Sequence, residues 1–211
     1  MSRQSDIRAF LRPTESLWRE PEPVESIGLD GVEGLILILN AITRRDEEYM
    51  RVKIYEQTWS CDLSRRTQQF GFHYDYWQRL VSASDRELPT WSEIALISLE
   101  NLGVYRENEK PNQLIVNEYE PGQGIAPHID HRAFGEPIVS LSLCAPIVMD
   151  FERDGFAKRS LLLPRRSALV LDGDARWLWR HGIAARRSDV VDGRERMRET
   201  RLSVTLRRAV L

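Results

Sequence analysis

The sequence predicts an α+β domain in which two helices precede a core of short β-strands, folded as a sandwich or a barrel. Two observations carry this prediction. Helix signals gather between residues 43 and 102, and the chain beyond residue 112 consists of short Val-, Ile- and Leu-rich segments separated by Gly, Pro or Asp. Helices followed by a run of strands are typical of α+β domains. The length of 211 residues suits one domain.

Residues 1–30 are expected to form a flexible tail, because three prolines interrupt them and their charges are mixed. Within this tail, Gln4, Ile7, Phe10 and Leu11 resemble the peptide by which proteins bind a sliding clamp. Such a peptide forms one helical turn and inserts its apolar side chains into a groove. The alternative is a short amphipathic turn that packs on the domain.

The domain itself is expected to span residues 31–211 and to begin with a strand at residues 35–39. Thr43 is a suitable N-cap for a helix that ends near residue 56, and acidic residues follow it in the first turns. The pattern Thr90-Trp-Ser-Glu93 predicts a capping box at the start of a second helix, which ends near residue 102.

Seven extended segments follow the second helix. They are short and apolar, and turn residues separate them. Their expected bounds are residues 113–119, 138–143, 147–151, 160–163, 168–171, 183–186 and 200–207.

The composition indicates a globular protein of a reducing compartment. No apolar run approaches the ~20 residues that cross a bilayer, and the N-terminus has no apolar signal segment. Two cysteines, Cys61 and Cys144, do not make a disulfide framework. We therefore expect an intracellular protein, cytoplasmic or nuclear, that acts as a monomer and has no membrane partner.

The net charge of −2 is unevenly distributed along the chain. Residues 1–152 carry 15 Lys and Arg against 25 Asp and Glu, whereas residues 153–211 carry 15 against 7. An Arg-rich C-terminal third could bind the phosphates of a nucleic acid. It could equally be a solvated surface, since charge patterning mostly reports solubility.

One His-x-Asp pair stands out as a candidate metal site. His128 and Asp130 are two residues apart, so on an extended segment both side chains leave from one face. His181 precedes a predicted strand and offers a third ligand. Two histidines and a carboxylate leave adjacent metal positions open, as in non-haem Fe(II) oxygenases. Alone, the pair is a weak signal, because histidines often satisfy hydrogen bonds in the core.

The last predicted strand carries an unusual polar face. Alternation places Arg201, Ser203, Thr205 and Arg207 on one side. Two guanidinium groups that point into a barrel need anionic partners, and a dicarboxylate would supply them. The alternative is an amphipathic edge strand with solvated arginines.

The order Asn-x-Tyr, His-x-Asp, a distant His and Arg-x-Ser-x-Thr-x-Arg is similar to that of the AlkB family of Fe(II)/2-oxoglutarate dioxygenases. The similarity covers roughly residues 34–208. It implies a double-stranded β-helix, or jelly-roll, core with N-terminal helices packed against it. It also implies Fe(II), 2-oxoglutarate as cosubstrate, and O₂.

The resemblance also implies roles for individual residues. The iron ligands would be His128, Asp130 and His181. Arg201, helped by Tyr119, would hold the distal carboxylate of 2-oxoglutarate, and Arg207 would hold its C1 end. Asn117 and Ser203 would form hydrogen bonds with the cosubstrate.

Residues 65–76 resemble the part of the family that covers the substrate base. A base lifted from its stack needs a flat apolar surface, and flanking cations are needed for the phosphates. The candidates for substrate binding are Arg65, Arg66, Phe70, Tyr74 and Tyr76, together with His131 and Arg132. The alternative is that the alternating aromatics form the core face of a strand. Arg132 stands where the founding bacterial repair enzyme has an acidic residue, so the base is not implied.

The motifs look most similar to the branch that contains the tRNA wobble-uridine hydroxylase. We expect an oxidative demethylase of alkylated bases in DNA or RNA, a DNA-repair activity that releases formaldehyde. The alternatives are a tRNA-modifying hydroxylase and a dioxygenase acting on protein side chains. A non-enzymatic adaptor and a cupin-type metal protein are disfavoured, because neither needs the arginines of the last strand.

Overall fold

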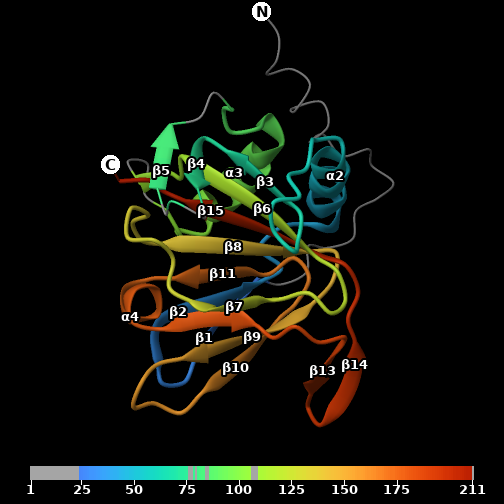
Figure 1. Ribbon diagram of the computed structural model, residues 1–211, viewed down its shortest axis with the longest axis vertical. Helices are drawn as coiled ribbons and strands as arrows, with labels where there is room; N and C mark the ends of the chain where they lie inside the picture. The colour runs from blue at the N-terminus through green and yellow to red at the C-terminus, as the bar shows by residue number, and fades with distance from the viewer. Residues whose placement is uncertain (1–23, 76–77, 79, 84–85, 106–108, 211) are drawn as a thin grey trace, which may run out of the picture.

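A computed structural model describes residues 24–75, 78, 80–83, 86–105 and 109–210 (Figure 1). The clamp-like residues Gln4, Ile7, Phe10 and Leu11, and also Tyr76, lie outside the described residues. Among the described residues, no helix is long and apolar enough to cross a membrane.

Two antiparallel sheets form the core. The larger has seven strands in the order β1-β2-β11-β8-β15-β6-β3, and the smaller has four in the order β10-β9-β12-β7. The larger sheet contains β1 (Glu25–Leu29), β2 (Val32–Leu39), β3 (Thr67–Phe70), β6 (Gln113–Tyr119), β8 (Ile138–Leu143), β11 (Ala168–Leu171) and β15 (Arg201–Arg207). The smaller contains β7 (Ile125–His128), β9 (Ile147–Glu152), β10 (Arg159–Leu163) and β12 (Arg180–Ile183). Two hairpins pair β4 (Phe72–Asp75) with β5 (Leu80–Ala83) and β13 (Ser188–Val191) with β14 (Arg194–Met197).

From β6 onward the chain passes repeatedly between the two sheets, which is the double-stranded β-helix that the resemblance implied. Alternating side chains divide the core into two layers. On β15, Leu202, Val204 and Leu206 join the apolar cluster that contains residues of the helices. The intervening Arg201 and Ser203 line a cavity on the opposite face, together with side chains of the smaller sheet. The predicted polar face of this strand therefore points inward.

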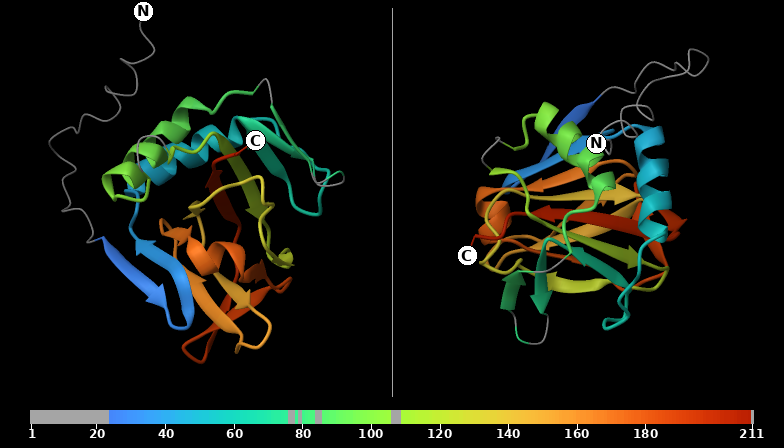
Figure 2. Two further views of the ribbon diagram at one scale, coloured as in Figure 1. Left: turned by 90° about the vertical axis from the view of Figure 1, so that its left-hand side faces the viewer. Right: turned by 90° about the horizontal axis from the view of Figure 1, so that it is seen from above.

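The helices α2 (Arg44–Tyr55) and α3 (Glu93–Asn101) lie on the same side of the barrel, against the larger sheet (Figure 2). Thr43 is the N-cap of α2, as predicted, and it forms a capping box with Asp46. The predicted capping box at Thr90 is wrong. Residues Thr90–Ser92 form a 3₁₀ turn (η1), with Pro89 at its N-cap and no capping hydrogen bond from a side chain. A short helix, α4 (Gly173–Trp177), was not predicted.

Two further expectations are corrected. The flexible tail does not extend to residue 30, because β1 already pairs with β2 along residues Glu25–Leu29. This edge strand is largely exposed, so it has no alternating apolar pattern that sequence could reveal. The strand expected at residues 183–186 lies instead at β12, where Gly182 permits a close approach to β7: a Cβ there would lie 2.9 Å from the Pro127 nitrogen.

Candidate active site

The candidate metal ligands come from two adjacent strands of the smaller sheet. His128 ends β7, and His181 lies directly opposite it on β12. Asp130 belongs to the turn that follows β7. A Cβ on Gly124 would lie only 2.2 Å from the Ile183 carbonyl oxygen, so glycine allows the two strands to approach at this end. The local pairing thus brings together residues that are far apart in the sequence.

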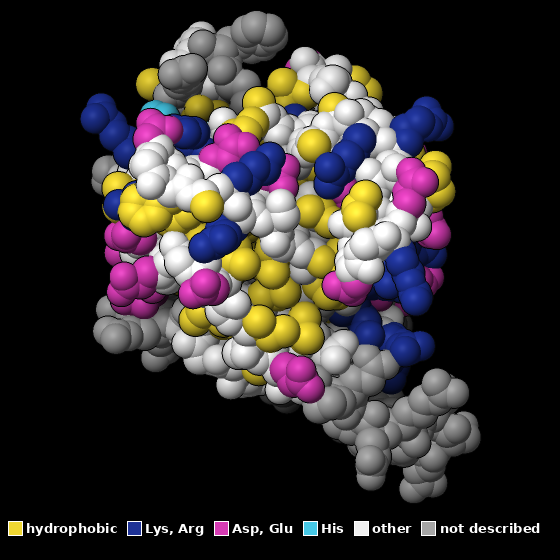
Figure 3. Space-filling model, turned by 90° about the horizontal axis from the view of Figure 1, so that it is seen from below, with side chains coloured by type: hydrophobic (Ala, Val, Ile, Leu, Met, Phe, Trp, Pro, Cys, Tyr) yellow, Lys and Arg dark blue, Asp and Glu magenta, His cyan; other side chains and the backbone are white. Residues whose placement is uncertain are grey.

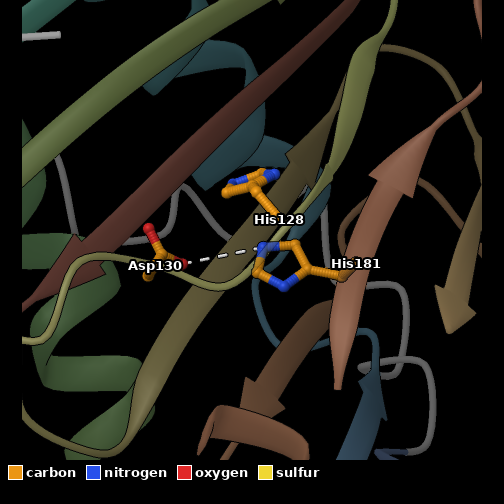
Figure 4. A group of neighbouring side chains, drawn as sticks. All are labelled: His128, Asp130 and His181. Atoms are coloured by element: carbon orange, nitrogen blue, oxygen red, sulfur yellow. Dashed lines mark ion pairs between the residues drawn. The ribbon is translucent and has the colours of Figure 1, made fainter. Parts of the chain in front are cut away.

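The three side chains point toward one another (Figure 4). One ligand atom from each lies within 4.8 Å of the others, and His181 Nε2 is 3.6 Å from Asp130 Oδ2. His128 Nδ1 lies 2.9 Å from the Ala126 carbonyl, which accepts its proton and leaves Nε2 for a metal. Within the described residues, this is the one group of His, Cys, Asp and Glu side chains with such spacing. The donor set fits Fe(II).

The protonation states also suit a metal. Burial tends to raise the pKa of Asp130, but the charges of Arg207 and the two histidines lower it to about 2. Burial, with His128 nearby, lowers the pKa of His181 to about 4. Near neutral pH the carboxylate is therefore charged and the His181 imidazole is neutral, which are the forms that bind metal ions.

Arg207 orients the carboxylate. Its Nη1 donates to Asp130 Oδ1 at 2.7 Å, and its Nε donates to Gln113 Oε1 at 2.8 Å. The guanidinium also lies 3.9 Å from the centre of the Phe134 ring. Because Oδ1 is held in this way, Oδ2 is the oxygen directed toward His181.

A cavity of about 510 Å³ opens beside the candidate metal ligands, between the two sheets. It is lined by all five residues predicted to bind the cosubstrate: Asn117, Tyr119, Arg201, Ser203 and Arg207. The Arg201 side chain is buried, and its Nε and Nη2 lie 3.3 and 2.9 Å from Ser142 Oγ. Burial lowers its pKa to about 10. Within the described part of the chain, Nη1 has no acceptor, so the cavity fits an anion that would provide one.

The predicted substrate residues separate into two groups. Arg65, Tyr74 and His131 line the cavity, and the rings of Tyr74 and His131 lie 5.7 Å apart. Tyr74 and His131 could therefore form a wall on which a flat ring stacks near the metal ligands.

Arg66, Phe70 and Arg132 do not line the cavity. The expectation that the Phe70 ring faces a base is corrected, whereas contacts of Arg66 and Arg132 with the substrate stay predictions. Arg66 binds Glu118, whose side chain leaves β6 on the face opposite Asn117. Phe70 is buried against Trp91 in the helix-side core. Arg132 is exposed. A turn at Gly71, with φ +77°, separates Phe70 from the following aromatic residues, so the run does not form one face.

Sequence reasoning missed three polar residues that support the site. Gln113 lies on the same face of β6 as Asn117 and Tyr119, so alternation could have revealed it. Ser142 accepts from Arg201, and Arg176 donates to three backbone carbonyls of the turn after β7. These last two contacts depend on the tertiary arrangement and have no local sequence signal.

Known proteins are similar to this chain in sequence or in fold. The 2OG-Fe(II) oxygenase superfamily matches residues 37–207. The tRNA (carboxymethyluridine(34)-5-O)-methyltransferase ALKBH8 of Mus musculus is 36% identical over 82% of this chain, but the chain spans only 28% of that protein. Uncharacterized protein L905 of Acanthamoeba polyphaga mimivirus is 33% identical over 85% of this chain and 86% of its own length.

Two further proteins are similar to this chain. The alkylated DNA repair protein ALKBH8 homolog of Arabidopsis thaliana is 32% identical over 93% of this chain and 64% of its own length. The solved structure of OsALKBH1 superimposes with a TM-score of 0.66 and 16% identity, over 88% of this chain and 100% of that one. At this identity the superposition supports the fold alone.

Proposed function

The chain belongs to the 2OG-Fe(II) oxygenase superfamily and, within it, to the AlkB family, and on this premise we propose that it removes alkyl groups from nucleic-acid bases by oxidation. Membership in this family implies Fe(II), 2-oxoglutarate and O₂. When bound, they supply the oxidant that inserts oxygen into a C–H bond. A hydroxylated N-methyl group then releases formaldehyde and restores the base nitrogen.

We assign the metal to His128, Asp130 and His181. Arg201 would bind the distal carboxylate of the cosubstrate, since its buried charge then gains the anionic partner that burial requires. Tyr119, Asn117 and Ser203 line the same cavity and would add hydrogen bonds. Arg207 keeps Asp130 in place by holding one of its oxygens, which leaves the other oxygen for the metal.

The observation that supports a base as substrate is the pair of rings beside the metal ligands. Tyr74 and His131 lie on the wall of the same cavity, and the Tyr74 ring is also 6.0 Å from Phe134. Aromatic surfaces of this kind hold an extruded base by stacking. Among the described residues that line the cavity, the one carboxylate is Asp130. Neutral and cationic bases should therefore both be tested.

A tRNA-modifying hydroxylase is the second candidate, and its support is the name of the mouse relative, which acts on a modified uridine of tRNA. The same oxygen insertion, on a carbon that is not bound to nitrogen, leaves a stable alcohol. The site residues are common to both reactions.

One assay separates the two reactions. The purified protein is supplied with Fe(II), ascorbate and 2-oxoglutarate and offered methylated DNA and RNA oligonucleotides and bulk tRNA, and products are identified by mass spectrometry. We expect replacement of a methyl group by hydrogen, with formaldehyde and succinate, and no product from Asp130→Ala. Gain of one oxygen on tRNA would support the second candidate. Succinate formation with no change in any nucleic acid would contradict both and favour a protein substrate.

The clamp-like peptide remains a separate prediction. Replacing Gln4 and Phe10 by Ala should abolish binding to a sliding clamp and leave turnover unchanged. Clamp binding that survives both substitutions would contradict the peptide's assignment.

A further inference from the structure

Arg65 occupies a different place from the one expected of a residue that contacts phosphates. The residue is 7% exposed, and its Nε donates to Asn117 Oδ1 at 2.8 Å. Arg65 precedes β3, which pairs with β6 so that Thr67 lies opposite Asn117. Tyr119 on β6 lies opposite Arg201 on β15. The adjacent strands therefore place Arg65 at the side of the cavity that contains Arg201.

The contact determines the orientation of the Asn117 amide. Arginine has only donors, so the atom of Asn117 that faces it must be the oxygen. The nitrogen, Nδ2, is then left for the cavity that Asn117 lines. Within the part of the chain that the structure describes, Nδ2 makes no hydrogen bond to a protein acceptor. An anionic ligand in the cavity would accept from Nδ2, whereas a flipped amide would present its oxygen and repel the same ligand.

The surroundings hold Arg65 in this position. Its guanidinium lies 5.7 Å from the centre of the Tyr119 ring, and that of Arg201 lies 5.6 Å from the same ring. The preceding residue is also fixed, because Gln123 Nε2 donates to the Ser64 carbonyl at 2.7 Å. Two cations beside one ring raise the positive potential at this end of the cavity.

We propose that Arg65 is a positioning residue for the cosubstrate, which acts by fixing the Asn117 amide with its nitrogen toward the cavity. The inference rests on the assignment of this cavity to 2-oxoglutarate. It replaces the expected phosphate contact, since a side chain that is bound to Asn117 inside the barrel is not directed toward a nucleic-acid backbone.

The test measures cosubstrate binding without turnover. Protein loaded with Mn(II) is titrated calorimetrically with 2-oxoglutarate in the absence of nucleic acid. Arg65→Met should weaken binding about 10-fold, as loss of a supporting contact typically does, and Arg65→Lys should restore part of it. Arg66→Met is the matched control, because Arg66 binds Glu118 on the other face of β6. It should leave the affinity for 2-oxoglutarate unchanged.

A double-mutant cycle identifies the route of the effect. If Arg65 acts through the amide, then Arg65→Met should have little effect on affinity when Asn117 is already Ala. If Arg65→Met weakens binding equally in both backgrounds, or binds 2-oxoglutarate normally, this inference is overturned. The assignment of the cavity to 2-oxoglutarate would still stand. Wild-type protein that holds Mn(II) but does not bind 2-oxoglutarate would overturn the cosubstrate assignment, and the inference with it. Thermal unfolding of each variant checks whether folding is intact.

Discussion

Arg201 is a residue at which function opposes stability. The residue is 1% exposed, and its Nη1 lacks an acceptor among the described residues. Even paired buried ionic groups are often replaced by apolar ones without loss of stability, or with a gain of about 1–4 kcal/mol.

We therefore predict that Arg201→Met raises the melting temperature of the metal-free protein by roughly 2–4 °C per kcal/mol gained. The same variant should lose affinity for 2-oxoglutarate and keep its affinity for Mn(II). Calorimetry and thermal unfolding measure both. If the variant binds 2-oxoglutarate normally, Arg201 is not its anchor.

The two cysteines should differ in reactivity. Burial, with Glu47 nearby, raises the pKa of Cys144 to about 11, whereas Cys61 is exposed. At about pH 8, only about one Cys144 thiol in a thousand is then the reactive thiolate. Iodoacetamide should modify Cys61 rapidly, and labelling should nearly vanish in Cys61→Ser. Because the thiolate fraction rises with pH up to the pKa, labelling of Cys144 should increase about tenfold per pH unit. Rapid labelling of Cys61→Ser at pH 8, read by mass spectrometry, would contradict this prediction.

At the residue scale, the direction of a side chain could be predicted wherever the alternation of a strand determines it. The inward face of β15 and the Asn117–Tyr119 pair of β6 follow from a period of two residues. The prediction failed for Phe70, because Gly71 interrupts the strand and turns the following residues to another face. The ion pair between Arg66 and Glu118 could not be predicted, because it depends on the pairing of β3 with β6.

At the scale of elements, the short helix α4 connects the two parts of the metal site. Arg176 is buried and donates to the carbonyls of Asp130, His131 and Phe134 at 3.1, 3.0 and 2.6 Å. Five residues later the chain reaches His181 on β12. One guanidinium thus holds the turn that contains Asp130 against the segment that leads to His181.

Arg176→Lys should weaken Mn(II) binding by about 10-fold, since an ammonium cannot span three carbonyls and supporting contacts usually contribute this much. Arg153→Lys is the control, because Arg153 binds Asp174 of the same helix at the surface. It should bind the metal normally. Equal affinities for the two variants would show that α4 does not support the metal site.

Several strands could be predicted from the sequence, and there are physical reasons why the others could not. The strands β6, β8 and β11 are mostly buried apolar segments, and the structure gives them the predicted bounds. The edge strand β1 and the hairpin strand β14 are largely exposed, so burial leaves little pattern in their sequences. In β12, the close approach at Gly182 sets the position of the strand, and this depends on β7 rather than on local propensity.

At the scale of the whole molecule, the opposite charges of the two parts of the chain meet in the fold. Arg165 binds the fully buried Glu47 of α2, and Arg207 binds Asp130. Seen from below, near β1, β10 and the β13–β14 hairpin, the surface carries hydrophobic side chains between charges of both signs (Figure 3). Part of the C-terminal arginine excess is therefore neutralised internally, and this face is not a continuous basic track.

The candidate site also joins the two sheets. His128 and His181 belong to the smaller sheet, whereas Asn117, Arg201 and Ser203 belong to the larger one. A metal and a cosubstrate bound in the intervening cavity would therefore link both layers. A ligand that binds only the folded protein stabilises it by about 2.7 kcal/mol at a concentration of 100 times its Kd.

We predict that 2-oxoglutarate at this concentration raises the melting temperature of the Mn(II)-loaded protein by roughly 5–10 °C. Mn(II) alone should give its own increase, and 2-oxoglutarate without metal should give little, because part of its binding comes from the ion. In Arg201→Met, Mn(II) should still raise the melting temperature, whereas 2-oxoglutarate should no longer do so. An increment from 2-oxoglutarate that is equal with and without metal would place it outside the cavity beside His128, Asp130 and His181. Such a result would separate the cosubstrate site from the metal site, which this fold brings together.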